Sequence, residues 1–144
     1  MNVSRVLLVA LALLIAACSP GTNASTAPSA ATTRIEVSLT DALRMDPATM
    51  TVPAGVAVTF VVTNTGAIDH EFYLGDEAAQ ADHEQEMQSM GGMAHDEPQG
   101  IALEPGETKE LTYTFAEPGS TLAGCHIAGH YAGGMKASIA VVAP

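Results

Sequence analysis

The fold of this chain is constrained most by a series of short β-branched and apolar segments separated by Gly- and Pro-containing turns. Residues 35–39 alternate apolar and polar side chains, as a half-buried strand does. Turn sequences at 53–55 (Pro-Ala-Gly) and 105–106 (Pro-Gly) interrupt the series. The pattern predicts an all-β antiparallel sandwich with strands at residues 35–39, 50–52, 56–62, 70–74, 101–103, 111–115, 121–125 and 137–142.

One stretch departs from the β pattern. Residues 76–90 have the composition of a good helix, Gly91-Gly92 would end that helix, and Pro98 lies beyond it. We therefore expect a short helical insert near 76–90 between two strands. A loop completes a Met- and His-rich insert that spans residues 76–98.

The amino-terminal residues are typical of an export signal. The uncharged run at 6–17 is too short to span a bilayer and has the length of a signal h-region. It ends in small residues before Cys18, which resembles a bacterial lipobox, where the signal is cut before a Cys whose sulfur carries a lipid. We expect a signal peptide at 1–17, a lipidated Cys18 with a flexible tether at 18–33, and a folded domain at 34–144. The alternative is an ordinary signal peptide that is cut elsewhere.

These features predict an exported lipoprotein, anchored in the cell envelope and facing the periplasm or the cell exterior. The chain has 5 Lys and Arg against 16 Asp and Glu, which excludes binding to nucleic acid phosphates but suits attraction to cations and basic protein partners. If Cys18 is lipidated, Cys125 has no disulfide partner. An unpaired Cys in an exported protein suggests a metal ligand.

Cys125, His130 and Met135 lie within eleven residues of one another. A thiolate, an imidazole and a thioether suit copper, and two His with one Cys and a weak axial Met form the blue-copper pattern. His70 is the best candidate for the second His, because it opens a predicted strand just after a turn. A thioether argues against zinc as the intended metal, and a catalytic thiol would need a His base with an orienting Asn or Asp.

From about residue 34 to 142, the chain resembles the cupredoxins, the family of plastocyanin, azurin and pseudoazurin. The resemblance rests on Pro53-Ala54-Gly55 before a Val-rich strand, on Asn64 and Gly66 before His70-Glu71-Phe72, and on Glu104-Pro105-Gly106 before another strand. It implies a Greek-key sandwich of about eight strands. It also implies that one type 1 copper is bound by His70, Cys125, His130 and Met135.

The spacing Cys-x₄-His-x₄-Met is longer than in plastocyanin and resembles the type 1 loop of multicopper oxidases, which begins His-Cys-His. Here Gly124 stands where those oxidases have the first His, and the chain has only five His. A trinuclear oxygen-reducing centre therefore cannot be built from this chain alone. We interpret His126 as a surface or supporting group, with an electron path to a partner as the alternative.

The Met- and His-rich insert has two interpretations. His83, Met87 and Met90 share one helical face, and Met93 and His95 follow in the loop. Thioethers prefer Cu(I), so these five residues could form a looser secondary Cu(I) site. The alternative is that Met87 and Met90 pack the helix against the sandwich and the nearby carboxylates form a solvated face.

Three functions are weighed. The first is one-electron transfer in the cell envelope, and the alternative is copper sequestration, delivery or resistance that uses the insert as an additional Cu(I) site. An enzyme such as a nitrite reductase or an oxidase would need a second copper centre from more His residues, so we expect no enzyme. The expected partners are a redox protein or a copper-handling protein and, through the lipid, the membrane. We expect a monomer.

Overall fold

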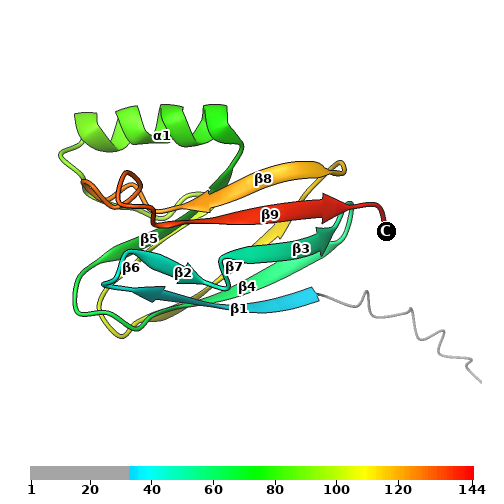
Figure 1. The fold of residues 1–144 in the computed structure, drawn as a ribbon, viewed down its shortest axis with the longest axis horizontal. Coiled ribbons are helices and arrows are strands. Elements are labelled where there is room, and N and C mark those ends of the chain that lie inside the picture. The colour runs from blue at the N-terminus through cyan, green and yellow to red at the C-terminus, as the bar shows by residue number, and fades with distance from the viewer. Residues whose placement is uncertain (1–32) are drawn as a thin grey trace, which may run out of the picture.

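A computed structural model describes residues 33–144, which form two β-sheets packed face to face with one helix on the outside (Figure 1). The elements in chain order are β1 (Thr33–Thr40), β2 (Arg44–Asp46), β3 (Thr49–Pro53), β4 (Ala57–Asn64), β5 (His70–Gly75), α1 (Glu77–Ser89), β6 (Gly100–Leu103), β7 (Thr108–Thr114), β8 (Gly119–Gly124) and β9 (Lys136–Val142). The predicted signal peptide, the lipidated Cys18 and the tether as far as residue 32 lie outside the described residues.

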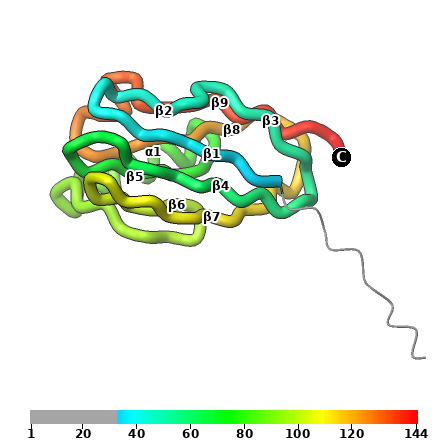
Figure 2. The backbone as a smooth tube through the Cα atoms, turned by 90° about the horizontal axis from the view of Figure 1, so that it is seen from below, coloured from blue at the N-terminus to red at the C-terminus, as the bar shows by residue number. Residues whose placement is uncertain are grey.

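The two sheets have the strand orders β2-β1-β4-β7 and β3-β9-β8-β5-β6. Figure 2 shows β1, β4 and β7 side by side on the face of the molecule away from α1. Most pairs are antiparallel as predicted, but β1 pairs with β4, and β3 with β9, in parallel. A parallel pair needs a long connection. Residues 41–56 provide it for β1 and β4, because the chain crosses to the other sheet at β3 and returns.

Each of the eight predicted strands overlaps an observed strand, so the predicted all-β sandwich is confirmed. The ninth strand of the described chain, β2, was missed. It is three residues long, and only Met45 in it is buried, so it has no alternation to detect.

The core lies between the two sheets. β9 alternates exposed and buried residues, with Ala137, Ile139 and Val141 facing inward. Phe60 of the first sheet meets Phe72 of the second, with ring centroids 5.3 Å apart. Complete burial of side chains of this size contributes about 1.5 to 3 kcal/mol each, so this interface holds the two sheets in a fixed relation.

The predicted helix is confirmed as α1, which covers the outer face of the second sheet at β5 and β8 (Figure 1). Asp76 caps its first turn by accepting a hydrogen bond from Ala79 N at 2.9 Å. The residues that α1 buries are Gln80, His83 and Met87, so its inner face is mostly polar. Such a face needs polar partners beneath it. Within residues 33–144, no helix is long and apolar enough to cross a membrane.

Candidate metal centre

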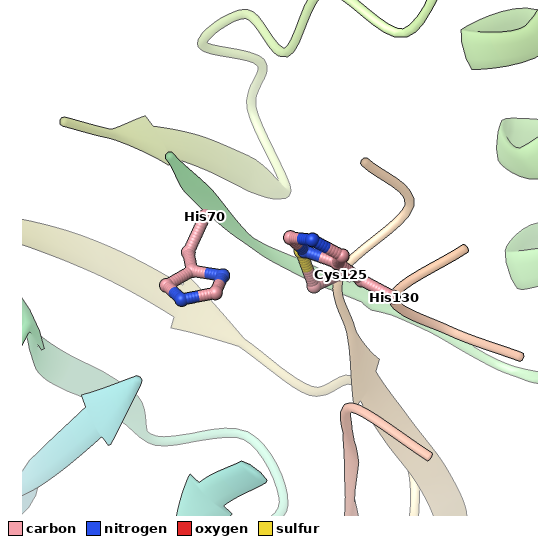
Figure 3. A group of neighbouring side chains, drawn as sticks. All are labelled: His70, Cys125 and His130. Carbon is pink, nitrogen blue, oxygen red and sulfur yellow. The ribbon is translucent and has the colours of Figure 1, made fainter. Parts of the chain in front are cut away.

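The fold brings the predicted ligands to one end of the sandwich. His70 is the first residue of β5, and Cys125 directly follows β8, the strand that pairs with β5. His130 and Met135 lie in the loop between β8 and β9. Figure 3 shows the side chains of His70, Cys125 and His130 turned toward one another.

The geometry suits three ligands of one ion. Cys125 Sγ lies 3.3 Å from His130 Nδ1, and the ring centroids of His70 and His130 are 5.1 Å apart. One ligand atom from each of the three residues lies within 4.8 Å of the other two. His70 and Cys125 are fully buried, and His130 is 9% exposed. The site is therefore shielded from water.

His70 supplies the test of whether a metal fits. Within residues 33–144, neither of its ring nitrogens has a hydrogen-bond partner, although Nε2 lies 3.4 Å from Asp41 Oδ1. A buried imidazole without a partner is costly. An ion held by His70, the neighbouring thiolate and the second imidazole would remove that cost, and this donor set is the one that copper favours.

The loop is shaped to present its ligands before a metal arrives. Met135 N donates to His130 O at 3.0 Å, and Cys125 N donates to Met135 O at 3.2 Å. Gly129 and Gly134, directly before His130 and Met135, have φ of +86° and +94°, which glycine adopts without strain. The Met135 side chain is fully buried, as expected of an axial ligand. Its role as the fourth ligand remains a prediction.

The environment of the sulfur favours a metal over free thiolate. Burial raises the pKa of Cys125 to about 12, with backbone hydrogen bonds opposing the rise. One of these comes from Glu71 N, which lies 3.3 Å from Sγ. Without a metal the thiol therefore keeps its proton at neutral pH, and binding a metal would release it. Burial also lowers the pKa of His130, which keeps that imidazole neutral and able to bind a metal.

The role of Glu71, which is fully buried beside the site, was not predicted from the sequence. Its Oε2 accepts from His126 N at 3.0 Å, and its Oε1 lies 2.8 Å from His83 Nε2. One residue therefore contacts the Cys125 sulfur, the residue after it, and α1. The available signal was a carboxylate inside an otherwise apolar strand.

The surface interpretation of His126 is wrong, because its side chain is only 2% exposed. Its Nε2 lies 2.6 Å from Gln80 Oε1 and its Nδ1 lies 2.6 Å from Glu84 Oε2. The hydrogen bond from His126 lowers the pKa of Glu84. The ring also stacks on Tyr131, with centroids 4.5 Å apart. These contacts make His126 a supporting group that joins the ligand loop to α1.

A steric constraint explains why residue 124 is a glycine. A Cβ at this position would overlap Gln80 Oε1 and approach the Tyr131 ring to 2.8 Å. The helix therefore fills the space that a side chain before Cys125 would occupy. This agrees with the absence of the His that multicopper oxidases have at this position.

The five residues of the predicted Cu(I) site differ widely in burial. Met87 is 1% exposed and packs beneath α1, as the packing alternative expected. Met90 is 36% and Met93 68% exposed, and Met93 lines a surface groove beside His70. The rings of His83 and His95 have centroids 6.4 Å apart. Cu(I) binding by this set remains a prediction.

Comparison with known proteins supports the assignment of a copper site. Residues 31–142 match the family model described as copper binding proteins of the plastocyanin/azurin family. The chain is 39% identical over 107 residues to the copper-resistant cuproprotein CopI of Rubrivivax gelatinosus, covering 74% of this chain and 65% of the relative. It is 35% identical over 136 residues to the copper-resistant cuproprotein CopI of Pseudomonas aeruginosa, covering 74% and 75%.

Among solved structures, auracyanin A of Chloroflexus aurantiacus, a "blue" copper protein, superposes with a TM-score of 0.65 at 28% identity, covering 76% of this chain and 98% of auracyanin A. The chain therefore belongs to the plastocyanin/azurin family of copper-binding proteins, and its fold is that of a cupredoxin. Copper is the metal that this site is built for.

Proposed function

We propose that this protein contributes to copper resistance in the cell envelope by binding copper at the type 1 site. The observation that carries the proposal is the buried, unpartnered imidazole of His70 facing Cys125 and His130 within residues 33–144. Two relatives named copper-resistant cuproproteins support a role in copper resistance.

The chain's own residues explain how copper would be held. Burial excludes water, and hydrogen bonds within the β8–β9 loop fix the positions of His130 and Met135. Bound copper supplies a one-electron couple and a strong affinity for thiolate. Because the ligands are pre-positioned, the protein binds copper with little rearrangement, which suits tight retention.

One-electron transfer is the second candidate. The likeness to auracyanin A, a "blue" copper protein, favours it. His130 is the most exposed of the four predicted ligands, at 9% against 0% for the others, and so offers the shortest path for an electron to a docked partner. The two roles share one site and differ in whether the site retains copper or passes an electron to a partner.

The proposal extends to location and partners. We propose an exported protein that Cys18 anchors to the membrane as a lipoprotein. It acts as a monomer, without turning over a substrate. A copper-handling or redox protein with a basic surface is the fitting partner, since the chain has a net charge of −11.

Growth of the host organism in copper tests the role. A strain lacking this protein is complemented with the wild type, with Cys125→Ser, or with Glu117→Gln, a change at an exposed turn. We expect the wild type and Glu117→Gln to restore copper tolerance and Cys125→Ser to fail. Equal tolerance with and without Cys125 would refute a resistance role for this site and leave electron transfer as the better account.

A further inference from the structure

A second cluster of ligand-type side chains lies between α1 and the loop that follows it. We propose that His83, Glu86 and Glu97 bind a divalent transition-metal ion of the Cu²⁺ or Zn²⁺ type. Their ligand atoms lie within 4.8 Å of one another, as do those of the type 1 site. The cluster sits on the outer side of the second sheet, where α1 covers β5 (Figure 1).

The neighbours of His83 hold its ring in an orientation that suits a metal ligand. Its side chain is about 1% exposed, and its Nε2 lies 2.8 Å from Glu71 Oε1. Because an ionised carboxylate only accepts hydrogen bonds, this contact places a ring proton on Nε2, and in the neutral ring the lone pair is then on Nδ1. Within the described chain, Nδ1 has no hydrogen-bond partner. Tyr73 stacks on the ring at 3.8 Å with planes 2° apart and fixes its direction.

The distances around Nδ1 fit a shared ion. Glu86 Oε2 and Glu97 Oε1 both lie 3.6 Å from His83 Nδ1. This is too long for a hydrogen bond. Two ligands at about 2.1 Å from a tetrahedral ion lie about 3.4 Å apart, close to the observed spacing. The lone pair of a neutral ring facing two carboxylates is repulsive unless a cation, either a proton or a metal ion, lies between them.

Within residues 33–144, Glu97 and its neighbour His95 also have buried polar atoms without partners beside this cluster. Among the described residues, Glu97 Oε1 and His95 Nδ1 are buried without a hydrogen-bond partner. His95 Nε2 lies 2.9 Å from Glu97 Oε1, but not in the direction of a hydrogen bond. His95 therefore lies beside Glu97, although it is not one of the three residues whose ligand atoms all lie within 4.8 Å of one another.

The donor set differs from the one predicted for Cu(I). It contains imidazole and carboxylate in place of thioether, and nitrogen and oxygen donors favour Cu²⁺ or Zn²⁺. The Glu71–His83 contact is the carboxylate–histidine arrangement that orients metal-bound imidazoles in many sites. Two carboxylates of the insert, for which a solvated face was one of the two interpretations, thus converge on a buried nitrogen.

Metal titration of the purified Cys125→Ser variant tests the proposal, because this background removes the thiolate of the type 1 site. Zn²⁺ and Cu²⁺ binding is measured by calorimetry in this background and again with Glu86→Gln or Glu97→Gln added. Glu86 is half exposed, so its substitution does not endanger the fold. Asp82→Asn is the matched control, because it removes one exposed charge from the same helix.

We expect one ion per chain that Glu86→Gln and Glu97→Gln each weaken at least about tenfold, while Asp82→Asn leaves the affinity unchanged. Cu²⁺ should bind more tightly than Zn²⁺ at the same site, following the general order for such ligands. Binding of neither ion, or equal affinity in the Glu86, Glu97 and Asp82 variants, would overturn the proposal.

Discussion

The packing of α1 against the metal loop predicts opposite effects for the same substitution at the two ends of β8. A Cβ at Gly124 would overlap Gln80 and approach Tyr131 to 2.8 Å, whereas within residues 33–144 nothing lies within 4 Å of a Cβ at Gly119. Overpacking of this kind costs about 1 to 3 kcal/mol. Replacing an unstrained Gly by Ala gains about 0.4 to 1 kcal/mol through the unfolded state.

We therefore expect Gly124→Ala to destabilise the protein by about 1 to 2 kcal/mol, and Gly119→Ala to be neutral or slightly stabilising. The gap between them is roughly 2 kcal/mol, or about 8 to 16 °C in Tm for a domain of this size. Thermal and urea unfolding of the metal-free proteins measure it. Equal stability of the two variants would refute the claim that α1 is packed directly over Gly124.

Three further predictions concern groups around the site. Asn64→Ala removes side-chain hydrogen bonds to the carbonyls of Ile68 and Leu103, and should lower the free energy of unfolding in urea by about 2 to 4 kcal/mol; a loss below about 1 kcal/mol would contradict this. Glu71→Ala should cost about 3 to 5 kcal/mol in the same assay, because it leaves two buried donors without their acceptor; a surface-like loss below about 0.5 kcal/mol would argue against the buried network. The folded pKa of Cys125, about 12, is raised from 9.0, so the stability gained by keeping the thiol protonated is full below about pH 9 and is lost as the pH rises toward 12. The metal-free wild type should therefore lose more stability over this range than Cys125→Ser, and parallel pH profiles would show that the thiol is not desolvated.

The strands could be predicted because their side chains alternate, as in β9, where every second residue is buried. The same alternation occurs in parallel and antiparallel pairs, so the parallel pairing of β1 with β4 was not readable. β2 has a single buried residue, Met45, and left no periodic signal. Local patterns thus located the strands but gave no information on sheet crossings.

Some residues of the candidate site could likewise be predicted from the sequence, and others could not. His70, Cys125 and His130 could be predicted because Cys and His are chemically distinctive, and the fold brings the start of β5 and the β8–β9 loop together. The contacts of Glu71 and Glu97 depend on where α1 and its following loop lie over the second sheet. The sequence does not show whether an acidic side chain is buried, so Glu71 and Glu97 could not be distinguished from carboxylates exposed to solvent.

Titration of the wild-type protein with Cu²⁺, followed by visible absorption, tests the central claim most directly. We expect an intense thiolate-to-copper band that saturates at one copper per chain. We also expect the band to be absent from Cys125→Ser and weakened in His70→Ala. A wild type that binds Cu²⁺ without such a band, or a band that survives in Cys125→Ser, would contradict the assignment of a type 1 site to these residues.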